Sequence, residues 1–178
     1  GFNPGSYEGF TCKNWKADQE RPAQLGEMAE VITYKFSRIT LTETWGLRAA
    51  VLWPEKDPGP TCQLAIDDLP DTFHFGVKGP TGVVSIGTFA KEVRPELPTG
   101  SHYRLRAMAT DQEHRERGVG RMLIEGALTE LSELGCSIVW ADARHVALGF
   151  YARLNWDVIG PTYEVPLRGP HRLVWRSI

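Results

Sequence analysis

The chain has 178 residues, 42% of them hydrophobic, with 20 Lys and Arg against 22 Asp and Glu and a formal net charge of −2. This length predicts one globular domain, and this composition is not that of a wholly disordered chain. A net charge so close to zero gives no overall attraction to nucleic acid or to an anionic membrane, so any anion binding has to be local.

Residues 1–30 are expected to form an N-terminal arm or tail that precedes the domain. Glycine, proline and polar residues are frequent there, and neither helical nor strand periodicity is visible. Four aromatic residues nevertheless fall in this segment, namely Phe2, Tyr7, Phe10 and Trp15. Aromatic residues at that density are typical of an arm that packs on its own domain or on a neighbouring subunit, so an ordered arm and a loose tail both remain open, and a homodimer is possible.

Residues 31–178 carry the signals of a folded domain. Residues 31–36 alternate in the manner of a strand, and Thr40 and Glu43 have the spacing of a capping box at the start of a helix that must stop before Pro54. A Gly-Pro-Thr-Gly turn at 79–82 predicts a hairpin. The elements expected in this half are a strand over 31–36, a helix over 40–52 and strands over 72–78, 82–91 and 102–110.

The pattern changes at Gly118, where apolar residues begin to recur at helical spacing, and Gly135 suits the end of that helix. The remaining elements expected are a buried strand over 137–140, a helix over 146–154 and strands over 157–164 and 171–177. The order β-α-β-β-β-α-β-α-β-β predicts a mixed α/β sheet in a single domain.

Three cysteines, Cys12, Cys62 and Cys136, lie far apart and form no C-x-x-C pair. Neither a zinc cluster nor a disulfide framework is indicated, and reduced thiols are expected. The sequence has no run of 18 apolar residues and no signal-peptide pattern at its start. We therefore expect a cytoplasmic protein that uses neither a membrane nor a metal.

The segment that indicates chemistry follows the strand over 102–110, where a polar loop opens into a helix at Gly118 and Gly120. Glycines allow a ligand to approach the backbone, and the first turn of a helix presents unpaired N–H groups that favour phosphate. Arginines in the same loop add donors for phosphate oxygens. Arg121 and Met122 exclude a P-loop and Leu123 excludes a dinucleotide fingerprint, because the required Lys, Ser/Thr and Gly are missing. A glycine-bearing helix start with a solvated arginine cluster remains the alternative.

The pattern Arg115-x-x-Gly118-x-Gly120 resembles the pyrophosphate-binding motif of the GNAT acyl-CoA N-acyltransferase superfamily. The segment 147–156 is similar to that family's A-x-x-x-Y-x-x-x-G-F motif, with Asn155-Trp156 in place of Gly-Phe. The resemblance is strong over 102–178, rests on element order over 31–101, and does not extend to 1–30. It implies a mixed, mostly antiparallel central sheet flanked by helices.

The resemblance also implies acetyl-CoA as cosubstrate, with no metal. Backbone amides across 117–121 would hold its pyrophosphate, and the strand end at 108–110 would pair with the pantetheine arm. A bulge in that strand would free an N–H for the thioester oxygen. The residues so assigned to the coenzyme are Met108, Ala109, Thr110, Arg115, Arg117, Gly118, Val119, Gly120, Arg121 and Phe150.

Tyr151 occupies the family's tyrosine position and is expected to be the general acid that protonates the departing thiolate, the alternative being a packed aromatic beside Phe150. The implied reaction is direct attack by a primary amine of a small molecule in a ternary complex. Many family members place a base on the strand that here spans 103–110, but that strand has no carboxylate. Asp142 is the favoured candidate base, and its alternative role is a structural one, as the N-cap of a helix over 143–147. Further candidates are Asp67, Asp68, His74, Glu92 and His145.

The acceptor amine is undefined by the sequence. The loop over 54–71 is expected to shape its pocket, and His171 either lines that pocket or is structural. Arginines that either attract an acidic acceptor or form a solvated face are Arg104, Arg106, Arg168, Arg172 and Arg176. Alternative functions on this scaffold are other acyl-CoA reactions, such as acyl-homoserine lactone synthesis or decarboxylation, and a non-catalytic acyl-CoA-binding module.

Overall fold

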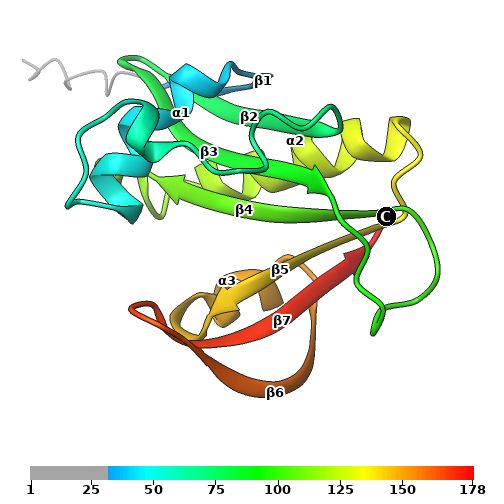
Figure 1. Ribbon diagram of the computed structural model, residues 1–178. Coiled ribbons are helices and arrows are strands. Elements are labelled where there is room, and N and C mark those ends of the chain that lie inside the picture. The colour runs from blue at the N-terminus through cyan, green and yellow to red at the C-terminus, as the bar shows by residue number, and fades with distance from the viewer. Residues whose placement is uncertain (1–31) are drawn as a thin grey trace, which may run out of the picture. The chain divides into compact units, whose positions relative to one another are not determined.

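The structure is a computed structural model that describes residues 32–178 of the chain, so the arm or tail expected over 1–30 lies outside the described residues. A seven-stranded sheet in the order β1-β2-β3-β4-β5-β7-β6 forms the centre of the domain (Figure 1). Every neighbouring pair is antiparallel except β4 and β5, which are parallel. The prediction of a mixed, mostly antiparallel sheet flanked by helices in one domain is therefore confirmed. The elements are β1 (Lys35–Arg38), α1 (Leu41–Leu47), β2 (Thr72–Gly79), β3 (Gly82–Lys91), β4 (His102–Thr110), α2 (Val119–Glu133), β5 (Ile138–Arg144), α3 (Leu148–Ala152), β6 (Asp157–Val165) and β7 (Gly169–Ser177).

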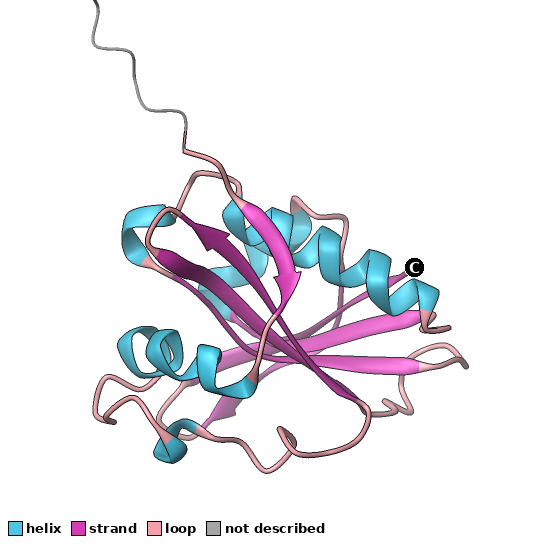
Figure 2. Ribbon diagram, turned by 90° about the horizontal axis from the view of Figure 1, so that it is seen from above, coloured by secondary structure: helices cyan, strands magenta, loops and turns pink. Residues whose placement is uncertain are grey.

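Helices cover the two faces of the sheet, as the view from above shows (Figure 2). The larger apolar core joins α2 and α3 to the sheet face that carries Phe75, Phe89 and Leu105. A smaller cluster joins α1 and the π-helical turn Arg48–Leu52 to the opposite face through Ile86. Alternate residues of each strand supply the two cores, as the strand period of two requires.

The parallel strands β4 and β5 separate along their length. They pair only from His102 with Ile138 to Arg104 with Trp140, and beyond that point the ribbons diverge (Figure 1). A bulge in β4 lies in the separated part, where Ala107 and Met108 together oppose Gly87 of β3, and Ala107 has a φ of 49°. The bulge expected near the end of this strand is thus present, and it faces an opening in the sheet.

Local signals in the sequence account for most element ends. Thr40 and Glu43 form both hydrogen bonds of a capping box. Gly135 has a φ of +81° directly after α2, and Asn155, a residue type that tolerates positive φ, has a φ of 58° at the turn into β6. Among residues 32–178, no helix combines the length and the apolar character that crossing a bilayer requires.

Three expected boundaries are wrong. The first strand is Lys35–Arg38 rather than 31–36, because its partner β2 ends at Gly79, one residue beyond the pair Lys35–Lys78. The strand expected to end at Trp140 continues to Arg144, because β7 pairs with it along its whole length. The helix expected over 146–154 shortens to α3, because a 3-10 turn over 145–147 precedes it.

Candidate active site

A cavity of about 500 Å³ occupies the opening between β4 and β5. Its walls come from both sides of the sheet, since it reaches Tyr151 of α3 as well as Asp142 of β5. The last strands and the end of the π-helical turn close it. The lining residues are Leu52, Trp53, Arg104, Leu105, Arg106, Ala107, Met108, Ala141, Asp142, Ala143, Arg144, Ala147, Tyr151, Tyr163, Val165, Arg168 and His171.

Tyr151 presents a hydroxyl with no strong partner among the described residues. Its ring is 6% exposed and packs against Phe150 and Trp156. Its hydroxyl donates only to the thioether sulfur of Met108, at 4.0 Å. Burial raises the pKa of the Tyr151 phenol well above its usual range, because the phenolate loses its hydration there. The group is therefore a protonated donor whose hydrogen bond is available beside the bulge.

Asp142 lies across the cavity with both carboxylate oxygens hydrogen-bonded. Arg104 Nη2 donates to its Oδ2 at 2.5 Å, and the Tyr163 hydroxyl donates to its Oδ1. Burial first, and then the hydrogen bond to this carboxylate, raise the pKa of Tyr163. Because Asp142 is a β5 residue that faces the cavity, its alternative role as a helix N-cap is wrong.

His171 offers a second proton acceptor in the same cavity. Its Nδ1 lies 2.8 Å from the carbonyl oxygen of Gly169, and a carbonyl oxygen can only accept, so Nδ1 carries the proton. The lone pair is then on Nε2, which makes no hydrogen bond with another residue of 32–178. The imidazole is 7% exposed and stacks on the Tyr163 ring. Of the two roles open from the sequence, the structure favours lining the pocket.

The predicted phosphate loop follows β4 and leads into α2. Gly118 is the N-cap of α2 and has a φ of +76°, a conformation that glycine adopts without strain. A Cβ on Gly120 would lie 3.3 Å from the Phe150 ring and 3.5 Å from Met108 Cε, so this turn packs closely against both. Arg115 and Arg121 donate to the backbone carbonyls of Thr110 and Arg153, which holds them near the loop.

Of the predicted coenzyme residues only Met108 lines the cavity, and the others lie further along the chain from β4 into α2, apart from Phe150 of α3. Met108 lies in the bulge, and Ala109 and Thr110 complete β4, with Thr110 Oγ1 2.8 Å from Ser85 Oγ. The side chain of Val119 is in the core, so only its backbone faces the loop. Arg117 is exposed, as are the side chains of Arg115 and Arg121.

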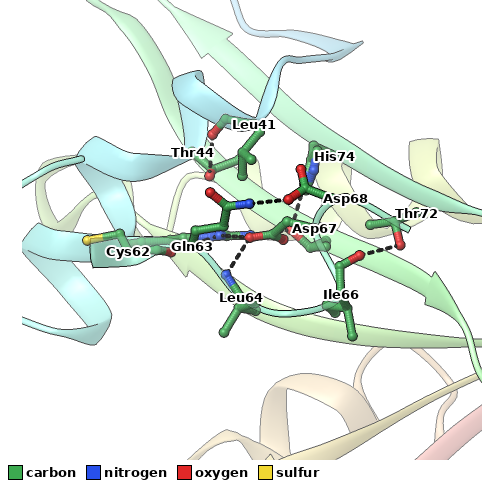
Figure 3. Close-up of polar contacts among 12 residues, drawn as sticks. Leu41, Thr44, Cys62, Gln63, Leu64, Ile66, Asp67, Asp68, Thr72 and His74 are labelled. Atoms are coloured by element: carbon green, nitrogen blue, oxygen red, sulfur yellow. Dashed lines mark hydrogen bonds and ion pairs between the residues drawn. The ribbon is translucent and has the colours of Figure 1, made fainter. Parts of the chain in front are cut away.

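Most of the further candidate bases lie elsewhere. Asp67 and His74 belong to a buried network around Arg48, and Asp68 accepts from Gln63 Nε2 at 2.5 Å (Figure 3). His145 is exposed. Glu92 binds the far side of Arg104 at 3.0 Å. Within 32–178 both cysteines, Cys62 and Cys136, are free and buried.

The sequence interpretation missed Tyr163 and Trp53 as cavity residues. Neither stands in a motif, and only the alternation of β6 could have placed Tyr163 on an inward face. Leu52 and Trp53 of the cavity wall end the π-helical turn that begins at Arg48. This turn precedes the loop that was expected to shape the pocket, and Arg168 donates to the carbonyl oxygen of Leu52 at 2.8 Å.

Comparisons with known proteins agree with this geometry. Residues 38–156 match the family model described as Acetyltransferase (GNAT) family. The chain is 33% identical over 140 residues to the "Uncharacterized N-acetyltransferase YitI" of Bacillus subtilis, covering 79% of this chain and 93% of that protein. The fold is similar to an acyl-CoA N-acyltransferase from Pseudomonas aeruginosa, with a TM-score of 0.64, 20% identity and coverage of 82% and 99%. It is also similar to an aminoglycoside 6'-N-acetyltransferase complexed with coenzyme A, with a TM-score of 0.62, 11% identity and coverage of 80% and 96%.

Proposed function

The chain belongs to the GNAT acetyltransferase family, and from that premise we propose that it transfers an acetyl group from acetyl-CoA to a primary amine of a small molecule. The observation that carries this proposal is the protonated, weakly bonded hydroxyl of Tyr151 in the cavity beside the β4 bulge. A hydrogen-bond donor at that point suits a departing thiolate. Because one fold serves many acceptors, the similar aminoglycoside enzyme does not define the acceptor here.

The residues around the cavity fit the coenzyme. The first-turn amides of α2 have no partner inside the helix, and they stand beside three arginines, which together suit a pyrophosphate. The positive φ of Gly118 and the close packing of Gly120 on Phe150 shape this turn. The bulge at Ala107 and Met108 interrupts the ladder with β3, which leaves backbone groups for the pantetheine arm and the thioester oxygen.

Replacing Gly118 with valine is expected to weaken acetyl-CoA binding by about ten-fold or more, since a β-branched residue is strained at this φ and shifts the amides of the turn. A Cβ there meets no atom within 4 Å, so the effect is one of backbone conformation. Gly135→Val is the matched control, because Gly135 ends the same helix at a φ of +81° and is also open around its Cα. Both variants should lose about 1–3 kcal/mol of stability, and calorimetric titration should show lost affinity in Gly118→Val alone. Equal affinity in the two variants would refute the pyrophosphate assignment.

Residues of the chain can donate the proton that the leaving thiolate needs and accept the proton that the attacking amine loses. Acetyl-CoA supplies an activated acetyl thioester, whose carbonyl carbon a neutral amine attacks directly. The new C–N bond replaces the C–S bond, the thiolate takes its proton from Tyr151, and the nitrogen gives up a proton to a base. We propose Asp142 as that base, and we add His171 as the second candidate, because its Nε2 lone pair is not engaged by any described residue.

Release of free thiol from acetyl-CoA, measured with a panel of primary amines, tests the function. Amine-dependent release together with an N-acetylated product supports it. Thermal stabilisation by acetyl-CoA without release on any amine indicates the binding module instead. Consumption of another acyl-CoA without an N-acetylated amine indicates the other acyl-CoA reactions.

The pH dependence of the same assay distinguishes the two bases. If His171 accepts the proton, His171→Gln lowers kcat by about 100-fold and changes its pH dependence. If Asp142 accepts it, His171→Gln keeps the profile and Asp142→Asn abolishes the activity at every pH.

A further inference from the structure

Positive charge dominates the wall of the cavity. Four arginines line it, and Asp142 is its one carboxylate among the described residues. Even when Glu92 is counted, which lies behind Arg104, four guanidinium groups stand against two carboxylates. An amine that binds there as a cation adds to this excess, whereas an amine that also carries a negative group reduces it. The arginines are Arg104, Arg106, Arg144 and Arg168.

These arginines are not equally available to a ligand. Arg104 is shared between Glu92 and Asp142, with N–O distances of 3.0 and 2.5 Å. Arg168 donates to the carbonyl oxygen of Leu52 and lies over the Trp53 ring, and Arg144 is exposed. Arg106, in contrast, is half-buried, and its side chain forms no hydrogen bond or ion pair with any other residue of 32–178.

Burial and the nearby charge of Arg104 lower the pKa of Arg106, while Glu92, Asp142 and Asp67 act in the opposite direction. Arg106 lines the cavity and is half-buried, so its side chain is partly withdrawn from bulk water. It remains charged, as arginine does in proteins. A half-buried cation without a protein partner is poorly stabilised until an anion reaches it.

The position of Arg106 separates it from the coenzyme's phosphates. It precedes the bulge residues Ala107 and Met108 in β4, whereas the phosphate loop follows the end of that strand. In register it lies opposite Thr88 of β3, on the face that also carries Asp142 and Arg104. An anion that pairs with Arg106 therefore belongs to the molecule that occupies the acceptor side of the opening between β4 and β5.

We infer that the acceptor carries a carboxylate close to its primary amine, and that the unpaired guanidinium of Arg106 binds this carboxylate while the amine faces the bulge. The inference rests on the proposed function and narrows its substrate class. It favours amino acids and related amino carboxylates, and it disfavours polyamines and other polycationic amines. Arg172 and Arg176 take no part, since they bind Gly160, Glu125 and Leu154 outside the cavity lining.

The experiment compares L-α-amino acids with their α-carboxamides in the thiol-release assay, with spermidine as a polycation. The α-amine of an amino carboxamide is less basic than that of the amino acid, so more of it is in the neutral, reactive form. This difference favours the amides and therefore works against the inference. The wild-type kcat/KM should favour the acids by about ten-fold or more. Arg106→Gln should bring acids and amides within about three-fold of each other by lowering the acids, with KM for acetyl-CoA unchanged, and Arg106→Lys should restore part of the preference.

Lys35→Gln is the control, because it removes one positive charge from the edge strand β1, far from the cavity lining. It should keep the wild-type preference. Equal turnover of acids and amides, a preference for spermidine, or an unchanged preference in Arg106→Gln would each overturn the inference. If no amine gives thiol release, the proposed function fails, and calorimetric binding of the same acids and amides to the coenzyme A-loaded protein decides the carboxylate site separately. Tighter binding of the acids that Arg106→Gln abolishes supports the site, and equal binding overturns it.

Discussion

Replacing Tyr151 with phenylalanine is expected to lower kcat by about 100-fold or more, with KM for acetyl-CoA changed by less than about three-fold. The variant keeps the ring that packs between Phe150 and Trp156 and loses only the hydroxyl. The departing thiolate then has no positioned proton donor. Steady-state thiol release, with the best amine of the panel, measures the loss.

The pH profile gives this prediction a second readout. Because burial raises the pKa of Tyr151, the phenol stays protonated well into the alkaline range, and wild-type kcat should show no loss from this group up to about pH 10. Tyr103→Phe is the control, since Tyr103 is a buried β4 tyrosine outside the cavity lining, and it should retain the wild-type kcat. A Tyr151→Phe enzyme with full kcat at all pH values would show that Tyr151 is only a packed aromatic.

Replacing Asp67 with alanine is expected to lower the free energy of unfolding by about 3–5 kcal/mol. Asp67 and Arg48 are both fully buried, and two N–O contacts of 2.6 and 2.9 Å join them. The loop around Asp67 is held by further bonds, from the Leu64 amide to its carboxylate and from Thr72 to the carbonyl of Ile66 (Figure 3). The variant leaves the Arg48 guanidinium in the core with only the Cys62 carbonyl and the Thr88 hydroxyl as acceptors.

Denaturant unfolding of two further variants tests whether the unpaired charge of Arg48 causes this loss of stability. Asp71→Ala removes an exposed carboxylate 4.0 Å from Lys91 and should cost about 1 kcal/mol or less. The double variant Arg48→Met with Asp67→Leu should be more stable than Asp67→Ala, because no buried charge is left alone. A loss below about 1 kcal/mol in Asp67→Ala would contradict the assignment.

The same pair predicts a pH dependence of stability. Burial acts to raise the pKa of Asp67, but hydrogen bonds from Arg48 and Leu64 outweigh it and hold the pKa below the usual value of an aspartate. A carboxylate whose folded-state pKa is lowered stabilises the fold above its unfolded pKa, and this contribution is lost as the pH falls through the folded one. Wild-type stability should therefore decline below about pH 4, with a smaller decline in Asp67→Ala.

This pair also connects stability to the site. Arg48 begins the π-helical turn whose last residue, Leu52, lines the cavity together with Trp53. Figure 3 shows the short loop from Cys62 to Thr72 folded around Asp67. A variant that stays folded but loses this contact should release that wall of the cavity, so KM for the amine should rise more than KM for acetyl-CoA.

The fold was largely predictable because its boundaries are encoded by neighbouring residues. The capping box at Thr40, the turn at 79–82 and the glycine after α2 each act over a few positions. The predicted boundaries were wrong where the pairing of a strand with a distant strand sets its length. The start of β1 depends on where β2 ends, and the length of β5 depends on β7, which lies more than 25 residues further along the chain.

The residues of the candidate site were likewise predictable where a local motif marks them and not where distant elements bring them together. The path from Met108 to Arg121 is one contiguous stretch, so its motif was legible, and Tyr151 was placed by a second local motif. Tyr163, His171 and Trp53 were missed or left open, because each reaches the cavity from a different element and carries no local signal. Asp142 could be singled out, but its bonds to Arg104 and Tyr163 depend on residues 38 and 21 positions away.

The sequence by itself determined a single α/β domain, a glycine-bearing helix start that suits phosphate, and a tyrosine two elements later. These features follow from caps, turns and motifs that act within a few residues. Only the tertiary structure decided which of five arginines line the cavity, because Arg104, Arg106 and Arg168 reach it whereas Arg172 and Arg176 bind elsewhere. The physical reason is that a side chain's partners are set by strand register and by the point where β4 and β5 part.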